Sequence, residues 1–314
     1  MNHLPLRLGT RQSPMAIAQS LRVAQLITAL TGRAVELTGI TTPGDLSQGQ
    51  LTQIGGTGVF VSALRESLLA GEVDIAVHSL KDLPTGQPAA IVLAAVPVRD
   101  DPRDALAAAD GVKLADLAPG ARIGTGSPRR AAQLLMIRPD IRPVPIRGNA
   151  GTRLAKVTSG EVDAVMLAYC GLARIGRLDA ITQIFEPEEM LPAPGQGALA
   201  VECRADRPDL AELLASIDDA PSRAATTAER ALLAALEAGC TAPIGAYAAG
   251  TAALRLHALV AAADGGRALR GSAGGPAGEA ERLGRTVAAD LLARGAERYT
   301  AVSSGHLSNG DDAQ

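Results

Sequence analysis

Residues 8–21 read LGTRQSPMAIAQSL, and residues 123–135 repeat the pattern as IGTGSPRRAAQLL. Each stretch joins an apolar strand end to a Gly-Thr turn, a Ser-Pro pair and an alanine-rich run. A serine followed by a proline is typical of a helix start, because serine caps free amides and proline fits the first helical position. A second pair, GEVDIAV at 71–77 and GEVDAVM at 160–166, recurs in the same order. The repeats predict two similar α/β lobes.

Short apolar runs alternate with Ala- and Leu-rich stretches around these repeats, which favours βαβ units and a mainly parallel sheet in each lobe. After a predicted helix at 218–239, the pattern becomes that of antiparallel strands, with a hairpin turn at 264–266 and a closing helix. The expected fold is therefore α/β with a small α+β C-terminal domain. The expected boundaries are 1–97 with 198–217 for the first lobe, 103–191 for the second, 220–303 for the third domain, and 304–314 for a disordered tail.

Composition restricts the class of protein. The net charge of the 314-residue chain is −3 and aromatic residues make up 2%, so neither a polyanion-binding surface nor a base-stacking platform is expected. Three scattered cysteines provide no disulfide framework and no metal site. No run approaches the length of a membrane span, and the N-terminus has no apolar segment typical of a signal peptide. We expect a cytoplasmic monomer that binds neither nucleic acid nor membrane.

Basic side chains recur just after predicted strands and at predicted helix starts, where parallel sheets bind ligands. The residues at such positions are Arg11, Ser13, Lys81, Arg129, Arg130, Arg147, Asn149 and Arg153, with Arg99 and Arg103 in a crossing segment. Any single arginine could be a solvated surface group. Together, on a chain of negative net charge, they predict a cleft for a ligand with several carboxylates or phosphates.

Asp82 is an acidic residue within this basic edge, and the matching position of the second repeat is Gly171. Asp82 could cap a turn, or it could form a salt bridge with Lys81 or an arginine. Alternatively, a lone carboxylate among cations could stabilise a cationic intermediate or move a proton.

Cys240 lies in the turn GCTAPIG, whereas Cys170 and Cys203 adjoin or lie in apolar strands and are expected to be structural. His78 is the only histidine placed to activate a thiol, and no Cys-His signature is present. Cys240 could therefore be an ordinary turn cysteine or the anchor of a prosthetic group.

Seven motifs in order, over about residues 5–300, resemble the porphobilinogen deaminase (hydroxymethylbilane synthase) family. The motifs are RLGTRQSPMAIAQ, DIAVHSLKDLP, RDDPRDAL, GTGSPRRAAQL, IRGNAGTRL, LPAPGQGALAVECR and GCTAPIGAYA. The resemblance implies three domains, the first two similar to the lobes of periplasmic binding proteins. It also implies a transferase of tetrapyrrole (heme or corrinoid) biosynthesis that polymerises four porphobilinogen molecules into the linear tetrapyrrole hydroxymethylbilane and releases ammonia.

The resemblance further implies a dipyrromethane cofactor attached to Cys240 by a thioether, with Asp82 as the catalytic aspartate that contacts pyrrole nitrogens. Porphobilinogen and the growing polypyrrole chain are the implied partners. The implied cofactor contacts are Lys81, Ser13, Thr125, Ser127, Arg129, Arg130 and Arg147. The implied substrate contacts are Arg11, Arg147, Arg153, Arg174 and Gln196, and no metal is implied.

Two positions depart from the family pattern, Thr57 where a lysine is frequent and Pro43 where an arginine can occur. Both lie in a predicted mobile loop, 42–60, so the departure concerns how that loop contacts the chain. Two other classes fit part of the sequence. A non-enzymatic two-lobed anion binder explains the repeats and arginines but not Cys240. A transferase acting on a phosphate ligand lacks a P-loop and a metal-binding acidic pair.

Overall fold

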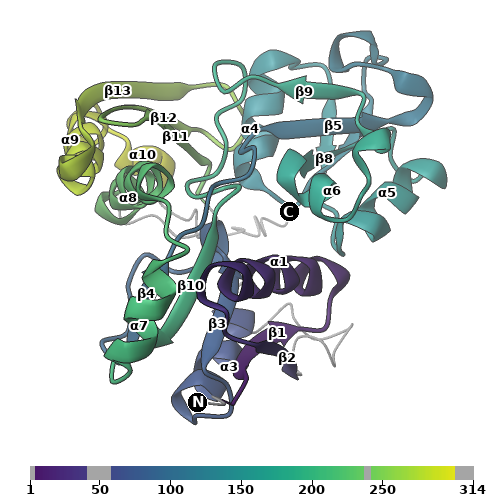
Figure 1. The fold of residues 1–314 in the computed structure, drawn as a ribbon. Helices are drawn as coiled ribbons and strands as arrows, with labels where there is room; N and C mark the ends of the chain where they lie inside the picture. The colour runs from purple at the N-terminus through teal and green to yellow at the C-terminus, as the bar shows by residue number, and fades with distance from the viewer. Residues whose placement is uncertain (1–3, 41–57, 237–241, 301–314) are drawn as a thin grey trace, which may run out of the picture.

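The computed structural model describes residues 4–40, 58–236 and 242–300. They form two lobes, each with a five-stranded sheet, and a small C-terminal domain with a three-stranded sheet (Figure 1). This arrangement confirms the predicted fold class. The predictions for Pro43, Thr57, Cys240 and the tail 304–314 concern residues outside this description.

The first lobe has the strand order β2-β1-β3-β10-β4. Its strands are β1 (Leu6–Arg11), β2 (Val35–Ile40), β3 (Ile75–Ser79), β4 (Ile91–Ala95) and β10 (Leu199–Arg204). Its helices are α1 (Pro14–Thr31), α3 (Gly58–Leu69) and α7 (Pro208–Ala215), with a short 3₁₀ turn, η1 (Leu80–Asp82), after β3. β1 is parallel to β2 and β3, whereas β10 is antiparallel to both of its neighbours.

The second lobe repeats this order as β7-β6-β8-β5-β9. Its strands are β5 (Asp104–Ala108), β6 (Arg122–Gly124), β7 (Arg142–Val144), β8 (Ala164–Ala168) and β9 (Gln183–Phe185). Its helices are α4 (Pro128–Ile137), α5 (Ala150–Thr158) and α6 (Tyr169–Arg174), with short turns η2 (Ala109–Gly111), η3 (Leu114–Asp116) and η4 (Leu178–Ala180). β5 is antiparallel to both neighbours. Each lobe thus places one antiparallel strand in the sheet that the sequence predicted to be mainly parallel.

The repeated Ser-Pro pairs form equivalent helix starts. The Oγ of Ser13 accepts from the amide of Ala16 at 3.3 Å at the start of α1, and Ser127 caps α4 in the same way. Gly32, in the left-handed conformation with φ 67°, ends α1. The repeated sequence therefore specifies the same strand-turn-helix unit in both lobes because the same capping groups satisfy the same free amides.

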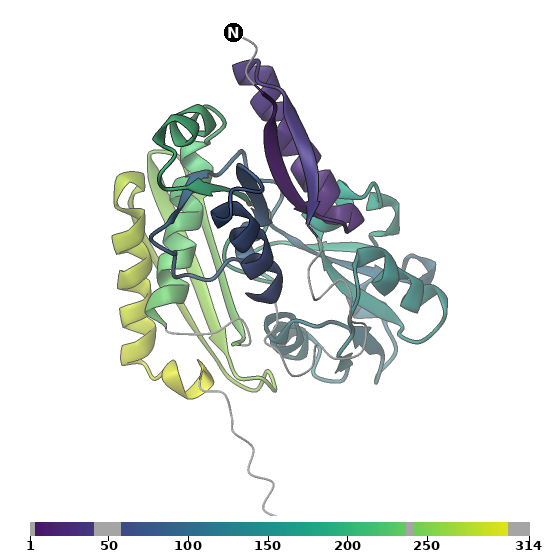
Figure 2. The ribbon, with the colours of Figure 1, turned by 90° about the horizontal axis from the view of Figure 1, so that it is seen from below.

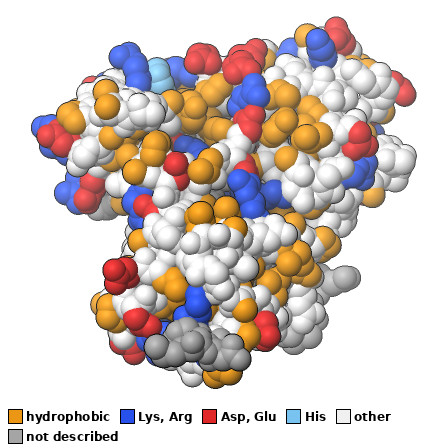
Figure 3. Space-filling view, viewed as in Figure 1, with side chains coloured by type: hydrophobic (Ala, Val, Ile, Leu, Met, Phe, Trp, Pro, Cys, Tyr) orange, Lys and Arg blue, Asp and Glu red, His pale blue; other side chains and the backbone are white. Residues whose placement is uncertain are grey.

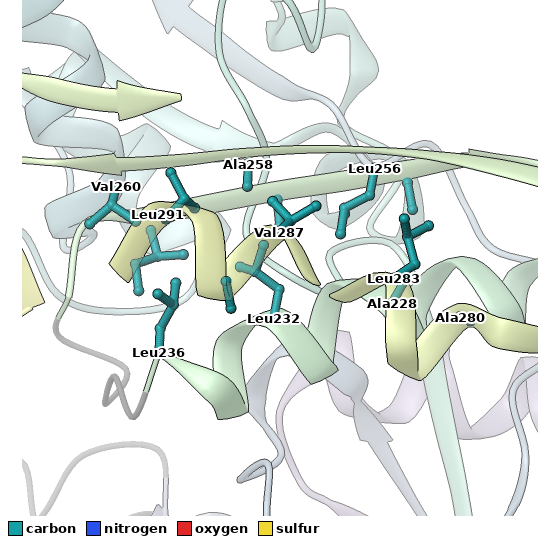
Figure 4. Close-up of a cluster of buried hydrophobic side chains, with 14 of the residues drawn as sticks. Ala228, Leu232, Leu236, Leu256, Ala258, Val260, Ala280, Leu283, Val287 and Leu291 are labelled. Atoms are coloured by element: carbon teal, nitrogen blue, oxygen red, sulfur yellow. The ribbon is translucent and has the colours of Figure 1, made fainter. Parts of the chain in front are cut away.

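The third domain packs two helices against one face of a sheet. Its strands are β11 (Ile244–Gly250), β12 (Ala253–Ala261) and β13 (Ala268–Pro276). Its helices are α8 (Ala220–Ala235), α9 (Ala280–Ala293) and α10 (Glu297–Thr300), with the turn η5 (Ala277–Glu279). Leu232 and Leu236 face Val287 and Leu291 below the strand that carries Leu256 and Val260 (Figure 4). In Figure 2 the light green α8 and the yellow α9 lie side by side along the sheet.

Two crossing segments, before β5 and before β10, connect the lobes and touch each other. The amide of Asp100 donates to the carbonyl of Gly197 at 3.3 Å. Gly197 has φ 92°, and a Cβ there would lie 2.4 Å from the carbonyl oxygen of Asp100. Only glycine fits this close approach without strain.

Candidate active site

A cavity of about 190 Å³ lies between the two lobes. Its walls come from the ends of the equivalent strands β3 and β8, the starts of α4 and α5, and the crossing segment at Gly197. The lining residues are Met15, Ser79, Lys81, Asp82, Arg130, Gly148, Asn149, Ala150, Arg153, Leu167, Ala168, Cys170, Gly171, Arg174, Gly197 and Ala198. Blue Lys and Arg side chains gather near the centre of the face in Figure 3, where the first lobe meets the rest of the molecule.

The two strand ends face each other across this interlobe cavity. β3 leads into Lys81 and Asp82, and the equivalent β8 leads into Cys170 and Gly171, all four of which line the cavity. The carboxyl ends of strands are where open α/β sheets bind ligands. The sequence repeat thus locates the cavity, and its divergence at this point leaves the carboxylate in the first lobe alone.

Asp82 lies on η1, and among the described residues no cation forms an ion pair with its carboxylate and its side chain caps no amide. Its neighbour Lys81 donates to Oε1 of Gln196 at 3.1 Å. Burial, reinforced by Arg130, lowers the pKa of Lys81. The alternative in which Asp82 pairs with Lys81 or caps a turn is therefore not what the structure shows.

Three arginines of the second lobe reach the cavity in different ways. Arg130 lines it while its Nε and a terminal nitrogen donate to Oδ1 of Asp104 at 3.0 and 2.7 Å. Arg174 donates to Asp100 at 2.8 Å and to the carbonyl of Gly197 at 2.7 Å. Arg153 donates to the carbonyl of Gly148, and no described carboxylate pairs with it. Burial, followed by repulsion from Arg130, lowers the pKa of Arg153.

Arg129 lies behind the cavity, because consecutive residues of a helix point about 100° apart. It is 3% exposed, and its terminal nitrogen donates to Oδ2 of Asp104 and to the carbonyl of Leu191, both at 2.6 Å. Burial raises the pKa of Asp104, but Arg129 and Arg130 outweigh this effect and lower that pKa well below its usual value. In this conformation Arg129 supports Asp104 and does not line the cavity.

The other expected site residues are not among those that line the cavity. Ser13 and Ser127 cap helices, and the hydroxyl of Thr125 accepts from the amide of Ser127 at 3.2 Å. Arg11 ends β1, and Arg147 is exposed beside the lining residue Gly148.

Gln196 is fully buried and links the lobes. It accepts from Lys81 of the first lobe and donates to Oδ1 of Asp104 in the second at 2.9 Å. Sequence reasoning missed Asp104, because it appeared as one of several charges in the crossing motif. The available signal was an acid at the first position of an otherwise apolar strand, DALAA at 104–108.

Cys170, Cys203 and His78 are buried inside the lobes. Cys203 is fully buried in β10, and burial raises the pKa of its thiol to about 11. Cys170 is also buried, although it lines the cavity. The Nε2 of His78 lies 3.3 Å from a carboxylate oxygen of Glu202 inside the first lobe. No described group of three or more His, Cys, Asp or Glu side chains is arranged to hold a metal, and no described helix is long and apolar enough to cross a membrane.

Fold and site together define a class: two-lobed α/β proteins with a small third domain and a cationic cavity, in which a carboxylate has no ion pair among the described residues. Residues 6–212 match the family model "Porphobilinogen deaminase, dipyromethane cofactor binding domain", and residues 224–293 match "Porphobilinogen deaminase, C-terminal domain". The chain belongs to the porphobilinogen deaminase family. This confirms the resemblance and the expected dipyrromethane cofactor.

Similar curated proteins cover nearly the whole chain. Porphobilinogen deaminase of Thermobifida fusca is 59% identical over 311 residues, 96% of this chain and 97% of that protein. Porphobilinogen deaminase 1 of Streptomyces coelicolor is 54% identical over 94% of this chain and 97% of its own length. Among solved structures, the VFT2 domain of BvgS from Bordetella pertussis has a TM-score of 0.43 at 18% identity, over 69% of this chain and 87% of that one. That score is too low to support a conclusion.

Proposed function

We propose that this protein joins four porphobilinogen molecules into hydroxymethylbilane, releases ammonia, and starts from a dipyrromethane attached to Cys240. Such a reaction needs cations for the acid side arms of the pyrroles and a fixed anion near the reacting ring. The observation that supports it is the placement of Asp82, which has no ion pair in the described part of the chain, in one cavity with Lys81 and three arginines.

The residues of the cavity fit dipyrromethane, because each of its rings carries an acetate and a propionate. Arg153 has no described carboxylate partner, and its fork of donors suits a carboxylate. When bound, the cofactor supplies the pyrrole end that receives each new unit. Arg130, Arg153 and Arg174 bind the acid side arms, and Lys81 adds a further positive charge.

Asp82 has the charge that the chemistry needs. Positive charge develops on a pyrrole nitrogen of the substrate as its amine departs and again as the new bond forms. A preorganised carboxylate stabilises such charge most where water is excluded. Asp82 is held at a strand end and has no ion pair among the described residues, so it is suited to accept a hydrogen bond from that N–H.

Domain boundaries, location and assembly remain predictions. The membership of β10 in the first sheet supports a first domain of 1–97 with 198–217, a second of 103–191 and a third of 220–303. A cytoplasmic location and a monomeric state are predicted from the sequence alone, and sedimentation velocity would test the monomer.

The mass of the intact protein tests the proposed attachment. We expect wild type to carry the mass of two pyrrole units, Cys240→Ser to lack it, and Cys170→Ala to keep it. Cys170 is the matched control because its thiol lines the cavity. An unmodified mass for active wild type, or an adduct that depends on Cys170, would refute the attachment. Ammonia release from porphobilinogen separates the transferase from a protein that only binds anions.

A further inference from the structure

Arg230, on α8 of the third domain, donates hydrogen bonds to the turn that carries Lys81 and Asp82. One terminal nitrogen of Arg230 donates to the carbonyl of Leu83 at 3.0 Å and to that of Leu80 at 3.3 Å. The other donates to the carbonyl of Pro84 at 2.7 Å. Within the part of the chain that the structure describes, these carbonyls are its hydrogen-bond partners. They lie on both sides of Asp82 in the chain.

The turn depends on such outside contacts. Because η1 has only three residues, it forms few internal backbone hydrogen bonds. Its last carbonyls therefore need partners from outside the turn. A guanidinium supplies several donors in a rigid fork, so a single arginine can satisfy several such carbonyls. Leu80 and Leu83 are buried in one cluster with Val96, which anchors the turn from below.

The opposite side of the turn is held by the crossing segment. The amide of Leu80 donates to the carbonyl of Ala198 at 3.0 Å, and Lys81 donates to Gln196. Asp82 has no ion pair among the described residues that would hold its carboxylate. Its position therefore depends on the backbone of the turn, which is held by Arg230 on one side and by the crossing segment on the other.

The helix that carries Arg230 is itself firmly held. The neighbouring Glu229 is fully buried and accepts from the amides of Gly195 at 2.7 Å and Ala248 at 2.9 Å. It also accepts from both terminal nitrogens of Arg99. These bonds fix the rotation of α8, so Arg230 acts from a rigid support.

The same helix leads directly toward Cys240. Leu236 follows the last residue of α8 and packs in the core of the third domain (Figure 4). Arg230 and Leu236 are six residues apart, which is about 9 Å along a helix. One helix thus holds the turn of Asp82 and, at its end, begins the segment that carries the proposed attachment site.

We infer that Arg230 is a positioning residue: it fixes the Leu80–Pro84 turn, and with it Asp82, to the helix that leads to the cofactor attachment. This inference rests on the proposed function. Arg230 itself does not line the cavity, so it acts on the reaction through Asp82.

Steady-state kinetics of Arg230→Met and Arg230→Lys test this role. A displacement near 1 Å can cost about 100-fold in rate. We expect kcat of Arg230→Met to fall roughly 10- to 100-fold with KM and the cofactor mass unchanged, and Arg230→Lys to recover part of the loss. The matched control is Arg223→Met, because Arg223 also ties α8 to backbone carbonyls of the first lobe, those of Leu93 and Ala94. We expect the control to keep kcat within about twofold.

A double variant separates positioning from general loss of structure. If Arg230 acts through Asp82, adding Arg230→Met to Asp82→Asn changes single-turnover rates little further. If the two losses multiply, or if Arg223→Met loses as much activity as Arg230→Met, the inference is wrong. The inference is also wrong if the Arg230→Met variant is folded, carries the cofactor and has the same turnover as active wild type.

Hydrogen exchange gives a readout that does not depend on activity. Amides of residues 80–85 should exchange faster in Arg230→Met than in wild type, and at the wild-type rate in Arg223→Met. Unchanged exchange in Arg230→Met would overturn the inference. If the variants differ in exchange in this way but wild type releases no ammonia from porphobilinogen, the proposed function is refuted and the positioning role of Arg230 is not.

Discussion

Replacing Asp104 with asparagine should destabilise the second lobe by about 3–5 kcal/mol. Asp104 is fully buried, and its carboxylate accepts four hydrogen bonds, one from Arg129, two from Arg130 and one from Gln196. Asparagine leaves two buried guanidiniums without a counter-charge, and removing one partner of a buried ion pair costs about 3–5 kcal/mol. At roughly 2–4 °C per kcal/mol, scanning calorimetry should show Tm lower by roughly 6–20 °C.

Acidification adds a second test of the same reasoning. Because the folded-state pKa of Asp104 is lowered, its stabilisation is present above about pH 4 and is lost as the pH falls further. The Tm difference between wild type and Asp104→Asn should therefore shrink from pH 5 to pH 3. The control is Asp179→Asn, which removes an exposed ion pair with Arg177 and should leave Tm within about 2 °C. A loss no larger than that of the control, or a difference unaffected by acid, would refute the reasoning.

Two further substitutions probe the crossing segments and the first lobe. Gly197→Ala should lower Tm much more than Gly176→Ala in calorimetry, because only at Gly197 does the new Cβ meet a backbone atom, the carbonyl oxygen of Asp100; equal losses would contradict the contact. Glu202→Gln should cost about 3–5 kcal/mol in urea unfolding at pH 7, because Arg65 loses its buried partner. Burial raises the pKa of Glu202, but its partners outweigh this effect and hold that pKa at about 2. The loss of unfolding free energy in Glu202→Gln should therefore decline below about pH 4.5. A loss that does not depend on pH would be inconsistent with the ion pair.

The strand-turn-helix units were predictable because their causes are local. A serine cap and a proline at the first helical position act within one turn, so two similar stretches predict two similar units. The places of β5 and β10 were not predictable in this way. Each follows a crossing segment and enters a sheet antiparallel to its neighbours, and an apolar run does not reveal which strands it will pair with.

The candidate site was predictable as a cluster but not residue by residue. Strand ends and helix starts located Lys81, Asp82, Arg130 and Arg153 at one cavity, because topology brings such positions together. Arg130 lines the cavity whereas Arg129 does not, and this difference depends on where a buried carboxylate lies. That carboxylate, Asp104, lies on β5, so the pattern of the helix that carries the two arginines does not show it.

The distribution of ion pairs gives Asp82 its distinct character. Other carboxylates near the crossing segments are occupied by arginines: Asp104 by Arg129 and Arg130, Asp100 by Arg22 and Arg174, Asp101 by Arg103, and Glu229 by Arg99. An acid bound in this way is held by its partner and has fewer lone pairs for a ligand. Among the described residues no cation pairs with Asp82, so the backbone of its turn must supply the precision that an ion pair would otherwise provide. An arginine on a neighbouring helix can hold such a turn by donating to its carbonyls without neutralising the carboxylate. A cation that binds the backbone of the turn, as Arg230 does, therefore suits this site better than a cation paired with Asp82.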